Sequence, residues 1–153
     1  MQQRPLILSL KPTYADLVFS GLKKAELRRR LSAQVANRDV FIYVSSPVKQ
    51  LRGGFRVGQV WSGSPEDIWK MVSHVAGVSR SVFDDYYEGT KIAHALEIMD
   101  VWEYAKPRPL DSLRESFDGF VVPQSYRFAT VSECRSFRNM KVLRPTSAFK
   151  NSA

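Results

Sequence analysis

Short apolar runs and alternations, separated by glycine, proline and serine, make up the hydrophobic pattern of this chain. Runs of this length indicate strands and short helices rather than a few long helices. We expect strands at residues 5–10, 21–30, 40–44, 55–61 and 91–104, and a late strand entered through a turn at 123–128. We expect helices to start at Thr13, Ser64, Ser79 and Asp111. Several strands wrapped around few helices are typical of an α+β, barrel-like domain.

Capping and turn residues set the expected boundaries of these elements. Thr13 is the expected N-cap of the first helix, with Asp16 completing a capping-box-like pair and Gly21 ending the helix. Glycine and proline predict three further breaks in the chain, at Gly53-Gly54, Pro107 and Pro109.

The segment from Gly21 to Arg30 concentrates charge in a predicted strand. Because alternate side chains of a strand share a face, one face should carry Lys24, Glu26, Arg28 and Arg30. The opposite face should carry Lys23, Ala25, Leu27 and Arg29. Such a row can hold an anion such as phosphate, while Glu26 accepts hydrogen bonds or orients the arginines. The alternative is a solvated edge strand whose charges prevent pairing with other chains.

Length and composition favour one domain with a single core. The 153 residues are 44% hydrophobic and 25% charged, which is typical of a globular protein. We expect the core domain at about 5–145 and a disordered tail at 147–153. With Cys134 and two histidines the chain shows no zinc spacing, so neither a metal nor a cofactor is expected. No apolar run is long enough to cross a bilayer and no secretory signal is visible, so the expected location is cytoplasmic, with no membrane partner.

The net charge of +8 is unevenly distributed along the chain. Residues 1–53 carry ten basic and three acidic side chains, and residues 106–153 carry nine and four. The middle, residues 54–105, carries four basic and eight acidic side chains. If the two ends meet in space, they form one positive face suited to phosphates, which favours a nucleic acid or a nucleotide as partner. The alternative is a generally basic protein without such a face.

Glu97 is a second candidate acidic group. It lies between Ala95 and Met99 on a strand face that is otherwise small or apolar. The carboxylate is therefore expected to point inward, where it needs a partner or takes up a proton. Lys23 or an arginine of the charged strand is the expected partner, and a structural salt bridge or an edge position is the alternative.

The charged segment resembles the signature of the ASCH domain family, a branch of the PUA-like superfamily. That signature, Gly-x-Lys-x-x-Glu-x-Arg, is met without departure by Gly21, Lys23, Glu26 and Arg28. The segment at residues 8–15 is similar to the first strand and helix entry of the family. The segment at 123–128 is similar to a turn found in its members. The resemblance covers roughly residues 6–130.

The resemblance implies a β-barrel with flanking helices and a cleft lined by the signature strand. It also implies binding of RNA or modified nucleosides, and a role in translation, RNA processing or transcription coactivation. One branch of the family hydrolyses the amide of acylated cytidine with a lysine, a threonine and a glutamate. The threonine of that branch stands where this chain has Glu26, whereas Lys23 and, by approximate strand placement, Glu97 match the other two roles. Another branch is linked to RNA cleavage, in which a lysine and acid-base groups could act on a phosphodiester without metal.

Two functional hypotheses remain open. The first is an RNA- or nucleotide-binding protein acting in RNA metabolism, translation or transcription regulation. The second is a metal-independent hydrolase, either a ribonuclease or an amidohydrolase of an acylated nucleoside, with Lys23 as base and Glu26 or Glu97 as its partner. Turns with amide, hydroxyl and aromatic groups add candidates, because amides read base edges and rings stack on bases. The candidate ligand-binding residues are Lys11, Tyr14, Lys23, Glu26, Arg28, Arg30, Ser45, Ser46, Gln124, Ser125 and Tyr126.

Overall fold

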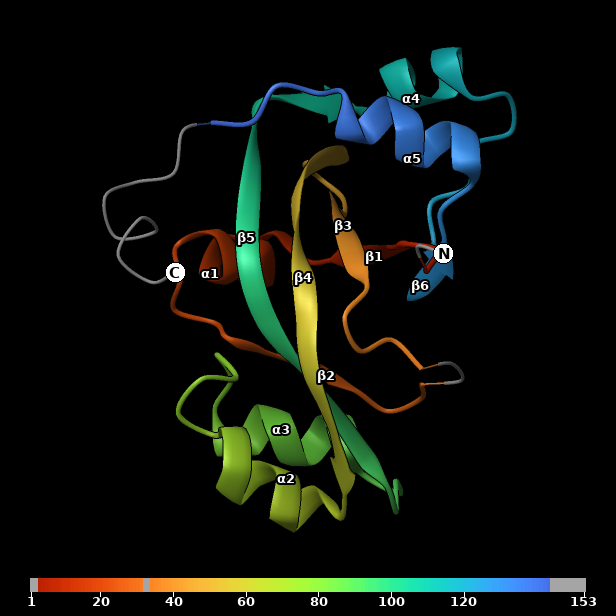
Figure 1. The fold of residues 1–153 in the computed structure, drawn as a ribbon. Helices are drawn as coiled ribbons and strands as arrows, with labels where there is room; N and C mark the ends of the chain where they lie inside the picture. The colour runs from red at the N-terminus through yellow and green to blue at the C-terminus, as the bar shows by residue number, and fades with distance from the viewer. Residues whose placement is uncertain (1–2, 32–33, 144–153) are drawn as a thin grey trace.

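A six-stranded sheet, curled on itself, forms the centre of the molecule (Figure 1). The computed structural model describes residues 3–31 and 34–143, so the predicted tail at 147–153 lies outside the described residues. The strands are β1 (Leu6–Leu10), β2 (Ala25–Arg28), β3 (Asp39–Val44), β4 (Gln50–Gly63), β5 (Ala93–Pro109) and β6 (Tyr126–Phe128). Their order in the sheet is β2-β5-β4-β3-β1-β6. β1 and β3 are parallel and the other neighbours are antiparallel. The predicted α+β, barrel-like fold is confirmed, with β2 and β6 as the two outer strands.

Five helices flank this sheet in the described part of the chain. They are α1 (Pro12–Phe19), α2 (Pro65–Val72), α3 (Arg80–Tyr87), α4 (Leu110–Ser116) and α5 (Val131–Arg138). Figure 1 shows α2 and α3 at one end of the long β4–β5 ribbon and α4 and α5 at the other. Among the described residues, no helix is long and apolar enough to cross a membrane.

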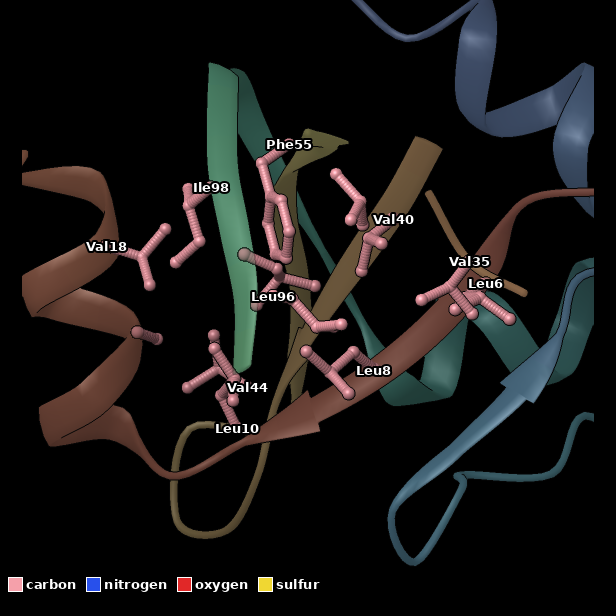
Figure 2. Packing of buried hydrophobic residues seen from close by; sticks show 13 residues of the cluster. Leu6, Leu8, Leu10, Val18, Val35, Val40, Val44, Phe55, Leu96 and Ile98 are labelled. Carbon is pink, nitrogen blue, oxygen red and sulfur yellow. The ribbon is translucent and has the colours of Figure 1, made fainter. Parts of the chain in front are cut away.

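The main core fills the inside of the curl (Figure 2). Leu6, Leu8 and Leu10 alternate along β1 and point to this side, where Phe55 and Leu96 meet them. Burying each such side chain contributes about 1.5–3 kcal/mol. Two satellite clusters lie outside the curl, one under α2 and α3 and one under α4 and α5. The sheet is therefore covered at both ends, and its curvature is fixed from both sides.

Gly53 and Gly54 lie inside β4 and do not break the chain, contrary to the sequence expectation. A methyl group on Gly54 would overlap the Trp102 ring, and one on Gly53 would overlap the backbone oxygen of Trp102. The two glycines are thus explained by the close approach of β5 to both of them and of the Val40 backbone oxygen in β3 to Gly54. The β4–β5 register shifts nearby, between Leu51 and Gly53 and again between Gly54 and Arg56, and such bulges bend a strand.

Proline also has a different role from the expected one at two boundaries. Helix α1 begins at Pro12 with Lys11 as its N-cap, so the expected cap, Thr13, lies inside the helix. The reason is that proline suits the first helical position and keeps the preceding residue extended. β5 continues to Pro109, past the expected break at Pro107, because proline is compatible with extended backbone.

Helix α5 was not expected from the sequence, although a local signal for it exists. Thr130 and Glu133 form a complete capping box, each side chain bonding the other's backbone N–H. Glu133 is buried, and Arg127 donates to both of its carboxylate oxygens at 2.8 and 2.7 Å. Burial acts to raise the pKa of Glu133, but the bonds from Arg127 and Thr130 outweigh it and lower that pKa. The T-x-x-E spacing predicts this start from sequence.

Gly53→Ala should destabilise the protein by about 1–3 kcal/mol, because the added methyl group has no space beside the backbone of Trp102. Urea denaturation measures the change in the free energy of unfolding. Gly63→Ala in the same strand is the matched control. Its methyl group would lie 3.7 Å from Asp67 Cβ, an ordinary contact, and its stability should stay within about 1 kcal/mol of wild type. Equal losses in both variants would contradict this account of the close approach.

Candidate functional site

The curl of the sheet brings its two outer strands toward each other around a cavity of about 560 Å³. β2 lines one side, and the turn that precedes β6 lines the other. Arg28 Nη1 donates to Ser125 Oγ at 2.8 Å and so bridges residues 97 positions apart in the chain. The basic N-terminal third and the C-terminal third therefore meet at this site.

Most of the predicted ligand-binding residues line this cavity. The structure brings together Lys11, Tyr14, Lys23, Glu26, Arg28, Ser45, Gln124 and Ser125. It does not bring Arg30, Ser46, Tyr126 or Glu97 to the cavity wall. Arg30 is exposed beyond the end of β2, and Ser46 is exposed in the turn after β3.

Tyr126 is directed to the core rather than to the cavity. It stands opposite Leu8 in the β1–β6 pair and packs against the main core cluster. Its neighbour Ser125 is the residue of this turn that reaches Arg28. The structure thus places Gln124 and Ser125 of the turn on the cavity wall and packs its aromatic residue against the core.

Glu97 also has a different position from the expected one. Its backbone stands opposite Ala25 of β2, but its carboxylate Oε1 accepts a hydrogen bond from the backbone N–H of Gln59 at 3.0 Å. A methyl group on Gly58 would overlap that oxygen. Glu97 therefore holds the irregular stretch of β4 between Val57 and Val60, and it is not the partner of Lys23.

Lys23 lies just before β2, which starts at Ala25, so the strand alternation does not separate it from Glu26. It is 3% exposed, its ammonium donates to the backbone oxygen of Ala76, and it lies 5.5 Å from the centre of the Tyr14 ring. Burial lowers the pKa of Lys23; the charge of Glu26 opposes this effect and the charge of Arg28 adds to it. A larger share of neutral amine is thus available than on a surface lysine.

Glu26 and Arg28 are buried side by side in β2. Their side chains are 8% and 11% exposed, and Glu26 Oε1 lies 3.9 Å from Arg28 Nη2. This distance makes an ion pair but exceeds a hydrogen bond. Two buried atoms, Glu26 Oε2 and Arg28 Nε, have no hydrogen-bond partner in the described part of the chain.

An apolar wall from α3 faces these charged groups, and sequence reasoning missed it. Its side chains are Val82, Phe83 and Tyr86 of α3, together with Val78 just before the helix. The guanidinium of Arg29 lies 5.0 Å above the Tyr86 ring, at the rim of the cavity. The paired tyrosines at 86 and 87 were visible in the sequence, but their position opposite β2 depends on tertiary packing.

Backbone contacts fix both sides of the cavity. The N–H groups of Lys24 and Ala25 donate to the oxygen of Val75 at 2.7 and 3.1 Å, which ties β2 to the segment between α2 and α3. On the other side, Ser9 Oγ donates to Pro123 O at 2.6 Å and Ser9 N donates to Ser125 O at 3.0 Å. The cavity is therefore held open between two anchored segments.

The arrangement offers cations and an acceptor beside an apolar surface, which suits a flat polar ring attached to a phosphate. Lys11 and Arg29 are exposed cations at the rim, whereas Lys23, Glu26 and Arg28 lie deeper. Within the described residues, no group of three histidine, cysteine, aspartate or glutamate side chains is placed to hold a metal ion.

Comparisons with known proteins agree with this geometry. The family model of the ASCH domain matches residues 8–114. A Zymomonas mobilis protein named ASCH domain-containing ribonuclease is 31% identical over 123 residues, which are 80% of this chain and 82% of that protein. The crystal structure of ASCH from Zymomonas mobilis matches with a TM-score of 0.84 and 28% identity, covering 90% of this chain and 96% of that one. The N-terminal domain of Staphylothermus marinus McrB, with a TM-score of 0.60 and 10% identity, shares the fold alone. The chain belongs to the ASCH domain family.

Proposed function

We propose that this protein binds single-stranded RNA by taking one nucleotide into the cavity between β2 and the turn before β6. The observation that carries the proposal is the combination of exposed cations at the rim with an apolar wall inside. A volume of about 560 Å³ lies in the range of pockets that enclose small organic ligands. RNA-binding proteins read single strands in this manner, by taking unstacked bases against aromatic or arginine side chains.

The distribution of charge in the site supports one orientation of the nucleotide, with its base inside the cavity and its phosphates at the rim. Lys11 and Arg29 can contact the phosphates and stay hydrated, because they are exposed at the rim. A base inside the cavity can stack on Tyr86 or Tyr14. The buried carboxylate of Glu26 offsets part of the attraction that Lys23 and Arg28 would exert on a phosphate deep in the cavity, because two anions repel there. The base and its ribose therefore enter the cavity, and the phosphates stay at the rim.

Cleavage of the bound RNA is a second candidate function, favoured by the ribonuclease relative and by Lys23. Neutral Lys23 would take the proton of a ribose 2′-hydroxyl, and the freed oxygen would attack the adjacent phosphorus. The 5′-oxygen leaves with a proton from solvent, giving a 2′,3′-cyclic phosphate and a 5′-hydroxyl. A rim cation, Arg29 or Lys11, would stabilise the charge that develops on the phosphate. Glu97 has no part in this proposal because its carboxylate lies on the β4 backbone.

Binding to RNA should weaken steeply with salt. Each phosphate contact adds about −0.7 to the slope of log affinity against log salt for a single strand. Arg29→Gln should therefore weaken binding and make the slope shallower by about 0.7. Fluorescence anisotropy of a labelled oligonucleotide, measured at several salt concentrations, gives both quantities.

Lys106→Gln is the matched control, because Lys106 is an exposed cation of β5 outside the cavity wall. Its affinity and slope should equal those of wild type. A wild-type affinity independent of salt, or equal effects of the two substitutions, would contradict binding at this rim.

Lys23→Met should change how stability depends on pH. The pKa of Lys23 is lowered from its ordinary value of 10.5, so above the lowered value the unfolded chain binds a proton that the folded chain does not. The stability contributed by Lys23 therefore rises as pH increases from the lowered pKa toward 10.5 and falls as pH decreases through that window. Urea denaturation from pH 7 to pH 10 should show wild type gaining stability relative to Lys23→Met. Parallel curves would contradict a lowered pKa.

The same variant separates binding from cleavage. If Lys23 is the base, Lys23→Met should lower turnover of a labelled RNA by ~100-fold or more, with the affinity for uncut RNA changed far less. The assay is run with and without a chelator, so that a contaminating metal-dependent nuclease is recognised. Unchanged turnover by a folded Lys23→Met protein would exclude Lys23 as the base.

A further inference from the structure

Two buried carboxylates of this chain, Glu133 and Glu26, differ in how many hydrogen bonds their oxygens accept. Both oxygens of Glu133 accept hydrogen bonds from Arg127, and one also accepts the N–H of Thr130. Glu26 is also buried, yet its Oε2 has no hydrogen-bond partner in the described part of the chain. An unpartnered buried carboxylate oxygen is costly, so its persistence indicates a partner other than the residues that the structure describes.

A second unpartnered atom lies on the same strand. Arg28 Nε is buried and makes no hydrogen bond among the described residues, although Nη1 of the same side chain is held by Ser125. Glu26 and Arg28 both line the cavity wall. Each of these two cavity-lining side chains thus carries one buried polar atom without a hydrogen-bond partner among the described residues, an acceptor on Glu26 and a donor on Arg28, and a small rotation of either side chain would turn that atom toward a bound ligand.

The chemistry of this pair distinguishes a base from a phosphate. A phosphate only accepts hydrogen bonds near neutral pH, so it could satisfy Arg28 Nε but would repel Glu26 Oε2. A nucleobase edge carries an N–H donor beside a carbonyl or ring-nitrogen acceptor, so it can satisfy both atoms at once. The apolar wall from α3 opposite the pair suits the face of such a ring.

We propose that Glu26 and Arg28 read the hydrogen-bonding edge of the nucleobase, which makes Glu26 the specificity-determining residue of the cavity. This inference rests on the proposed binding of single-stranded RNA. It assigns the phosphates to Lys11 and Arg29 at the rim, and it requires an N–H group on the bound base.

The test compares the affinities of hexanucleotides of uridine, cytidine and adenosine, measured by fluorescence anisotropy. Wild type should bind the best of the three about tenfold more tightly than the worst, and Glu26→Gln should reduce that spread to within about threefold. A glutamine amide can present either a donor or an acceptor to the base, so Glu26→Gln should discriminate less between the three bases. Arg29→Gln should lower all three affinities by one common factor.

An abasic hexanucleotide isolates the contribution of the phosphates. It should bind Glu26→Gln at least as tightly as wild type, because the substitution removes a negative charge and no base contact is lost. A uniform loss across all four oligonucleotides in Glu26→Gln would overturn the inference and assign Glu26 to general support of the site.

A methylated ligand tests the inference on wild-type protein and so does not depend on the folding of any variant. The best hexanucleotide is remade with methyl groups in place of the N–H hydrogens on the base edge. It should bind at least about tenfold more weakly than its parent. Equal binding of parent and methylated ligand would overturn the reading of the base edge. Absence of binding to every oligonucleotide would instead overturn the proposed RNA binding, and with it this inference.

Discussion

The pairing of β4 with β5 is the constraint on which the rest of the structure depends. These strands run together from Gln50–Pro109 at one end to Gly63–Ala93 at the other, and their register shifts three times on the way. Each shift bends the ribbon, so a sheet of open topology curls until its outer strands face each other. The core inside the curl, the helices at its two ends and the cavity between its edges all follow from that bend.

The cavity combines side chains that are unfavourable to bury. Lys23 is nearly inaccessible to solvent and is stabilised by a backbone oxygen, the ring of Tyr14 and the charge of Glu26. Glu26 in turn has incomplete hydrogen bonding. Such groups cost stability in an isolated fold and are typical of functional sites, where a ligand completes them. Glu133 shows that the same chain can satisfy a buried carboxylate fully where only structure is at stake.

Local signals predicted the parts of the fold that depend on short-range physics. The apolar run of β1 and the serine caps of α2 and α3 lie where their patterns predict them. The same local reading singles out the signature residues Lys23, Glu26 and Arg28, which the structure places on the cavity wall, because charge density in a short segment needs no tertiary information. The errors have one cause. Tyr126 faces the core because its register in the sheet places it opposite Leu8, and Glu97 reaches the β4 backbone at a shift in the β4–β5 register. Both outcomes depend on strand pairing, which local sequence does not specify.

The glycine pair in β4 is another feature whose role depends on tertiary contacts. Gly53 and Gly54 are ambiguous in sequence between a turn and a close approach, and the positions of Trp102 and Val40 resolve the choice. The apolar wall of α3 is a similar case, because its side chains carry no chemical signal until β2 is placed opposite them.

The tie between Val75 and β2 has a consequence for the behaviour of the protein at high concentration. An incompletely closed sheet exposes N–H and oxygen groups along its margin, and these groups recruit strands from other molecules. Here the N–H groups of Lys24 and Ala25, at the start of the outer strand, are already bonded to Val75. The opposite outer strand, β6, is three residues long and offers little length for addition. The fold can therefore keep its cavity open to a ligand while resisting growth into intermolecular sheets.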